Sequence, residues 1–137
     1  NKDETANKTP DLALIQQAMQ MMTKQYKTRF IIKSGSKLSS VPTEDILYFF
    51  SEHRTTYLKT KDLKKHAIDY TLEQLDGLLN PQFFFKLNRK FMTAFPAIKE
   101  VVTYSNSRLK VELVDLKNED VLVGRDKIGE FKQWLDQ

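Results

Sequence analysis

The chain has 137 residues, 40% of them hydrophobic and 29% charged, and its 22 basic and 18 acidic residues give a net charge of +4. This length and apolar content suit one domain with a single core, and the positive balance permits an anionic partner without requiring one. The absence of cysteine excludes disulfides, thiol nucleophiles and thiolate metal sites, and no apolar run approaches the roughly 20 residues needed to cross a membrane.

Residues 1–27 are expected to form a linker that precedes the folded domain. Thr9-Pro10-Asp11 combines an N-cap residue, a proline suited to the first helical position and an acid favoured there, which predicts a helix start. This helix would be amphipathic and would pack against an upstream domain, a second copy or the body of this domain, because apolar residues recur at helical spacing at Leu12, Ile15, Met19, Met22 and Tyr26. The start at Asn1, without a methionine, suggests a piece of a longer protein.

From Thr28 onward the apolar residues tend to alternate with polar ones, a period that predicts strands. A first hairpin is expected around Ser34-Gly35-Ser36, followed by a turn at Pro42–Asp45. The run Ile46–Phe50 is continuously apolar, which predicts a strand buried on both faces. Beyond a polar loop, two further strands are expected at Thr56–Lys59 and Leu63–Ile68.

A short helix is expected from Thr71 to Leu79, because Thr71-Leu72-Glu73-Gln74 has the spacing of a capping box and Asn80-Pro81 would end the helix. The later strands and a closing helix are expected at Ile98–Tyr104, Arg108–Val114, Val121–Val123 and, for the helix, Arg125–Asp136. The predicted fold is mainly β, with several small antiparallel sheets and short helices over residues 28–137, preceded by the linker helix.

Motifs for catalysis or metal binding are scarce. His53 and His66 are the only histidines, and no HExxH spacing occurs. Gly124 and Gly129 bracket four residues, but no Lys-Ser/Thr pair follows as a phosphate-binding loop requires. We therefore expect a protein that is not an enzyme and that holds no metal and no cofactor.

The stretch Phe83–Phe91 organises the candidate site. The expected buried anchors are Phe84, Phe85, Leu87 and Phe91, and Asn88-Arg89-Lys90 lies between them without an acidic neighbour. Arg54 and Arg125 also fall at predicted loops or element boundaries, where a rigid body can aim side chains outward. Arginine and asparagine can read base edges, and lysine adds charge toward phosphates. On these residues alone, ordinary solvated charges are the better interpretation, and the occurrence of arginine at three separate loops makes binding of an anion such as DNA the competing one.

The same stretch carries a family resemblance. Phe84–Phe91 (FFKLNRKF) resembles the Phe-Phe-Arg-hydrophobic-Asn/His-Arg/Asn-X-Phe signature of LytTR domains, which are DNA-binding output domains usually found at the C-terminus of bacterial response regulators. The resemblance covers about residues 28–137. Other segments in the family's order are Arg29–Gly35, Glu44–Phe50, Thr56–Leu58, Asp69–Leu75, Ala97-Ile98, Arg108–Leu113 and Val121–Phe131.

The resemblance implies a DNA interface made of loops that enter successive major grooves. It places base contacts at Arg89, Arg125, Thr56, Asn88, Arg54 and His53, and phosphate contacts at Lys90 and Lys127. His53 and Arg54 are alternatives to Thr56, because the family often has a longer polar residue at that position. Two residues depart from the family pattern: Ala94 stands where a polar asparagine is common, and Gly124 stands where serine is frequent.

The resemblance also implies a biological setting. The expected function is sequence-specific binding of double-stranded DNA by a cytoplasmic two-component transcriptional regulator, as a homodimer on repeated half-sites with a receiver domain upstream and no membrane partner. One alternative is a protein–protein interaction module that uses the N-terminal helix or a β edge. A second alternative, binding of single-stranded RNA, would need exposed aromatic platforms among Tyr48, Tyr57, Phe85 and Tyr104.

Overall fold

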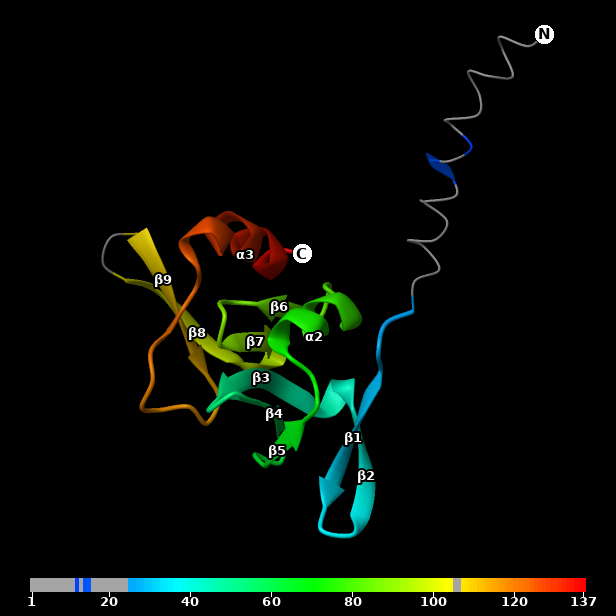
Figure 1. Cartoon of the computed structure of the whole chain (residues 1–137). Coiled ribbons are helices and arrows are strands. Elements are labelled where there is room, and N and C mark those ends of the chain that lie inside the picture. Colours follow the sequence, from blue (N-terminus) through cyan, green and yellow to red (C-terminus); the bar gives the residue numbers. More distant parts are fainter. Residues whose placement is uncertain (1–11, 13, 16–24, 105–106) are drawn as a thin grey trace, which may run out of the picture.

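A computed structural model describes residues 12, 14–15, 25–104 and 107–137 of the chain (Figure 1). The predicted N-terminal helix lies mostly outside the described residues, and Leu12, Leu14 and Ile15, which are described, are exposed. The strands are β1 (Arg29–Ser34), β2 (Lys37–Pro42), β3 (Ile46–Glu52), β4 (Thr55–Thr60), β5 (Lys65–Ile68), β6 (Phe84–Lys86), β7 (Phe91–Ala94), β8 (Ile98–Tyr104), β9 (Arg108–Leu113) and β10 (Val121–Leu122). The helical elements are η1 (Thr43–Asp45), α2 (Leu72–Leu78), η2 (Phe95–Ala97), η4 (Arg125–Lys127) and α3 (Ile128–Leu135).

The strands form three antiparallel sheets. The central sheet has the order β5-β4-β3-β7-β6, a second sheet has the order β10-β9-β8, and β1 pairs with β2. Most pairings join strands that follow one another along the chain, but β3 pairs with β7 through Tyr48↔Thr93 and its neighbours. This arrangement confirms the prediction of a mainly β fold with several small antiparallel sheets and short helices.

The central sheet is covered on both faces, so the fold has two hydrophobic cores where the composition predicted one. In β3, Ile46 and Phe49 face the first core, whereas Leu47, Tyr48 and Phe50 face the second. The pairing register shifts between Ile46 and Tyr48, and such a bulge lets two consecutive residues turn toward the same side. The prediction of a strand buried on both faces is confirmed.

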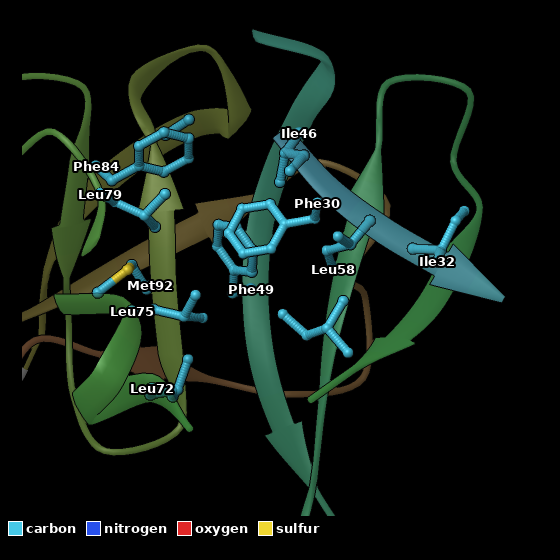
Figure 2. Close-up of a cluster of buried hydrophobic side chains, with 12 residues drawn as sticks. Phe30, Ile32, Ile46, Phe49, Leu58, Leu72, Leu75, Leu79, Phe84 and Met92 are labelled. Atoms are coloured by element: carbon cyan, nitrogen blue, oxygen red, sulfur yellow. The ribbon is translucent and has the colours of Figure 1, made fainter. Parts of the chain in front are cut away.

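The first core lies between the central sheet, the β1–β2 hairpin and α2 (Figure 2). Phe30 of β1 meets Phe49 of β3 edge to face, with the ring centroids 5.4 Å apart. α2 begins with the predicted capping box: the Thr71 hydroxyl accepts the Gln74 backbone N–H at 3.1 Å, and Gln74 Oε1 accepts the Thr71 N–H at 2.9 Å.

The second core lies between the other face of the central sheet, the β8–β10 sheet and α3. Phe131 is fully buried and Trp134 nearly so, as the apolar spacing of this segment predicts. The helix expected from Arg125 starts later, because Arg125–Lys127 forms a 3₁₀ turn and α3 begins at Ile128. Gly124 precedes this turn and offers no side chain to cap it, and 3₁₀ turns are frequent at helix ends.

The strand directions give the central sheet two distinct ends. β3 runs from Ile46 to Glu52, β6 ends at Lys86 and β7 starts at Phe91, so the β3–β4 and β6–β7 turns lie at one end of the sheet. The starts of β3 and β6 and the last residue of β7 lie at the other end, and the two ends of β3, which has seven residues, are about 20 Å apart at the usual rise of a strand.

Candidate nucleic-acid interface

The β6–β7 turn is shaped by Asn88. Its Oδ1 accepts the backbone N–H groups of Lys90 at 2.8 Å and Phe91 at 2.9 Å, and its Nδ2 donates to the Leu122 carbonyl at 2.7 Å. A side chain that hydrogen-bonds the backbone two and three residues ahead fixes a tight turn. Arg89 is thereby held exposed at the tip of the turn, and the Asn88 side chain is largely committed to the protein itself.

The segment after β10 lies directly against this turn. The Gly124 N–H donates to the Leu87 carbonyl at 2.9 Å, and the Asn88 amide donates to the Leu122 carbonyl at the end of β10. Val123 is fully buried and its N–H donates to the Leu109 carbonyl at 3.0 Å. Arg125 therefore follows an anchored segment beside the turn that carries Arg89, although the two arginines are far apart in sequence.

The β3–β4 turn is the third loop at this end of the sheet. β3 and β4 extend further than expected, and only His53 and Arg54 remain between them. Both have positive φ, 51° and 65°, which is the backbone pattern of a type I′ hairpin turn. The Ser51 N–H donates to the Lys90 carbonyl at 2.9 Å and so ties this hairpin to the turn of Arg89.

The three arginines of these loops are available to a ligand. Arg54, Arg89 and Arg125 are exposed, and within the described part of the chain none of their guanidinium groups makes a hydrogen bond or ion pair. The lysines differ from them. Lys90 Nζ lies 2.5 Å from Glu119 Oε2 in a half-exposed ion pair, and Lys127 is half-buried in the 3₁₀ turn.

Thr56 does not reach the same surface. It lies within β4, paired with Ser51 and Ile68, and only 7% of it is exposed. A hydroxyl buried in a strand cannot approach a base edge, so its burial argues against the base contact predicted for it. His53 and Arg54 are the exposed residues of this hairpin.

Two residues of the site were missed in the sequence. Arg108 Nη2 donates to the Val123 carbonyl at 3.2 Å and so braces the segment that leads to Arg125. Glu119 holds Lys90. Arg108 lies in the family-like segment Arg108–Leu113, but each residue lies 15 or more positions from its partner, so local spacing carried no signal for either contact.

The described residues give little support for a metal site, a membrane-spanning helix or an aromatic RNA-binding surface. Within them, no three His, Cys, Asp or Glu side chains gather where they could hold a metal ion, and no helix is long and apolar enough to span a membrane. Tyr48 is buried, Phe85 and Tyr57 are half-buried, and Tyr57 stacks on Phe50 inside the protein. Of the four aromatics considered for RNA stacking, only Tyr104 is exposed, at 41%.

The fold and the three loops at one end of the central sheet define a class of protein. It is a β-rich domain that presents unpaired arginine side chains from adjacent turns, as a nucleic-acid-binding domain does. A model of the LytTr DNA-binding domain family matches residues 36–136. The chain belongs to the LytTr DNA-binding domain family, which is a family of DNA-binding domains and not of enzymes.

A solved structure has the same fold. It is the LytTr DNA-binding domain of a methyl-accepting/DNA response regulator from Bacillus cereus, with 21% sequence identity and a TM-score of 0.67. The similarity covers 81% of this chain and 99% of that chain. No match was found among the curated proteins.

Proposed function

We propose that this domain binds double-stranded DNA sequence-specifically through Arg89 and Arg125, which would read base edges in successive major grooves. The observation that carries the proposal is the pair of backbone hydrogen bonds, Gly124 to Leu87 and Ser51 to Lys90, that unites three loops at one end of the sheet. Arginine presents a planar fork that matches the O6 and N7 acceptors of guanine. An exposed guanidinium without an internal partner has no ion pair to break before it binds.

The neighbouring residues have distinct roles in this proposal. His53 and Arg54 form the third contact loop, at the tip of the β3–β4 hairpin. Lys90 and Lys127 contact phosphates, which supplies affinity without sequence preference. Asn88 acts mainly by positioning Arg89, since both ends of its amide are already hydrogen-bonded.

The proposed setting is that of a cytoplasmic two-component regulator. Membership of the LytTr family and the similarity to the response-regulator domain from Bacillus cereus support a role as the output domain of a response regulator. Residues 28–137 would be the DNA-binding domain and residues 1–27 a linker to a receiver domain. Two copies would bind repeated half-sites, spaced by about one helical turn of 10–10.5 bp or a multiple of it.

The test starts with selection of a preferred site from random duplexes. Arg89→Ala and Arg125→Ala should each weaken binding to that site by about 1–3 kcal/mol and relax the preference at one base position. Arg29→Ala is the matched control, because Arg29 is exposed on β1, outside the three loops. Lys127→Ala should instead weaken all sequences alike and reduce the salt slope by about 1.

Wild-type affinity and base preference in both arginine variants would contradict the assigned contacts. A salt titration with mixed-sequence duplex separates the alternative function, a protein-interaction module. DNA binding should fall steeply as salt rises, whereas a protein-interaction module should not bind duplex at any salt concentration.

A further inference from the structure

An apolar groove lies at the end of the central sheet opposite to the arginine loops. It is a cavity of about 570 Å³ between the start of β3, the end of β7 and the C-terminal end of α3. Most of its wall is apolar and includes Ile46, Phe84, Ala94, Pro96, Trp134 and Leu135. Phe83 and Phe95 also line it and are each 57% exposed, which leaves two large rings in water at one place on the surface.

Hydrogen bonds and a ring contact fix the walls of this groove relative to one another. The Gln82 carbonyl accepts hydrogen bonds from Trp134 Nε1 at 3.2 Å and from Gln137 Nε2 at 2.5 Å, so the end of α3 is tied to the segment before β6. The rings of Phe95 and Trp134 meet edge to face with centroids 6.2 Å apart. The groove is therefore preformed, and burying its exposed rings would be favourable.

The chain enters the domain beside this groove. The Thr43 N–H donates to the Thr28 carbonyl at 2.9 Å, and Thr43 lines the groove. The Lys27 N–H donates to the Leu78 carbonyl at 2.8 Å, five residues before Phe83. The backbone at Lys27 and Thr28, which directly precedes β1 (Figure 1), is thus fixed next to the groove wall.

The segment that precedes Lys27 has apolar side chains that are exposed to solvent. Leu12, Leu14 and Ile15 are 57%, 62% and 54% exposed, and Met19 and Met22 continue the stripe in the sequence. Methionine adapts to irregular apolar surfaces because its side chain is unbranched and flexible. Three residue steps, about 10 Å when extended, separate Met22 from Gln25, the first residue of the described segment that leads into β1, so the stripe adjoins the point where the chain enters the domain.

We propose that the apolar stripe of residues 12–22 docks in the groove of its own chain, over Phe83 and Phe95. Docking would fix the direction in which the upstream chain leaves the domain, at the end away from the arginine loops. The proposal does not depend on DNA binding, and its test needs no DNA.

Two experiments test the docking directly, and the first uses the absence of cysteine from the chain. In the first, the pair Met19→Cys and Phe95→Cys is oxidised in the full chain at low concentration. The expected product is an intramolecular disulfide, seen as a monomer of increased electrophoretic mobility. The control pairs Gln17→Cys with the same Phe95→Cys, because Gln17 stands two residues away on the opposite face of the predicted helix.

Three results would overturn the proposal: no disulfide, equal yields for the Met19 and Gln17 pairs, or disulfide-linked dimers whose yield rises with concentration. The last result would assign the groove to the segment of a second copy. In the second experiment, Met19→Ser with Met22→Ser should increase hydroxyl-radical labelling of the Phe83 and Phe95 rings, which the docked stripe would cover, and Gln17→Ser should not. Unchanged labelling in the methionine variant would also overturn the proposal.

Discussion

Gly124 donates its backbone N–H to the carbonyl of Leu87 at 2.9 Å, and this contact joins the two loops that carry Arg125 and Arg89. Gly124 has φ −55°, a value that any residue can adopt. A Cβ at this position would meet only Asp126 Oδ1 closely, at 3.2 Å, and that atom ends a side chain that can move. Gly124 therefore matters for its N–H more than for its conformational freedom.

The first prediction follows from this contact. Gly124→Pro fits the observed φ but removes the N–H and places a ring carbon against the Leu87 carbonyl. We expect a loss of at least about 0.5–1.5 kcal/mol in the free energy of unfolding and weaker binding to the preferred duplex. Gly124→Ala keeps the N–H and should stay near wild type in urea unfolding and in duplex binding. Equal behaviour of the two variants would count against this role of the hydrogen bond.

The second prediction concerns the Asn88 side chain. Asn88→Ala leaves the N–H groups of Lys90 and Phe91 and the Leu122 carbonyl without their side-chain partner. We expect a loss of about 1–3 kcal/mol in the free energy of unfolding, measured by urea denaturation. Arg89→Ala, one residue away and exposed, should leave the stability unchanged while it weakens DNA binding. A stable Asn88→Ala protein with wild-type urea midpoint would mean that the turn does not depend on this amide.

The third prediction concerns the ion pair of Lys90 with Glu119. A DNA phosphate must compete with the Glu119 carboxylate for Lys90 Nζ, which lies 2.5 Å from it in the free protein. Glu119→Gln should therefore tighten binding to all duplexes and increase the salt slope by up to about 1. Glu44→Gln makes the same change in net charge at the groove end and is the control. A tighter complex with both variants, to the same degree, would assign the effect to net charge alone.

The fourth prediction concerns Tyr48 in the second core. Burial, and to a lesser extent the nearby Asp115 carboxylate, raises the pKa of Tyr48 from 10.0 to about 12. The stability that this phenol contributes should be present below pH 10 and lost as the pH rises through about 12, because the folded protein disfavours the phenolate. Tyr48 Oη donates to the Val114 carbonyl at 3.1 Å, so Tyr48→Phe should cost about 0.5–1.5 kcal/mol at neutral pH.

The measurement is the free energy of unfolding of wild type and Tyr48→Phe at neutral pH and between pH 10 and 12. The difference between the two proteins should shrink over the alkaline range, since only the wild type has to accommodate the ionisation of Tyr48. Tyr104→Phe, at an exposed position, controls for the loss of one tyrosine. A constant difference at all pH values would contradict the assigned pKa effect.

Patterns within a few residues of one another are enough to predict the short elements of this protein. Alternating apolar residues and turn residues predict the β1–β2 hairpin, and the continuous apolar run predicts that β3 is buried on both faces. The capping-box residues Thr71 and Gln74 predict the start of α2. These features depend on residues within a few positions of one another. For the same reason, the sequence could place Arg89 and Arg125 on loops and could suggest their chemistry.

Tertiary structure decided which of these elements meet. The β3–β7 pairing, the two cores, the burial of Thr56 and the commitment of Asn88 to Leu122, 34 residues away, come from packing between distant segments. Local spacing carries no information about such contacts, because their free energy is gained only when the whole chain closes around the central sheet. That closure brings the arginine loops to one end of the sheet and leaves the apolar groove at the other.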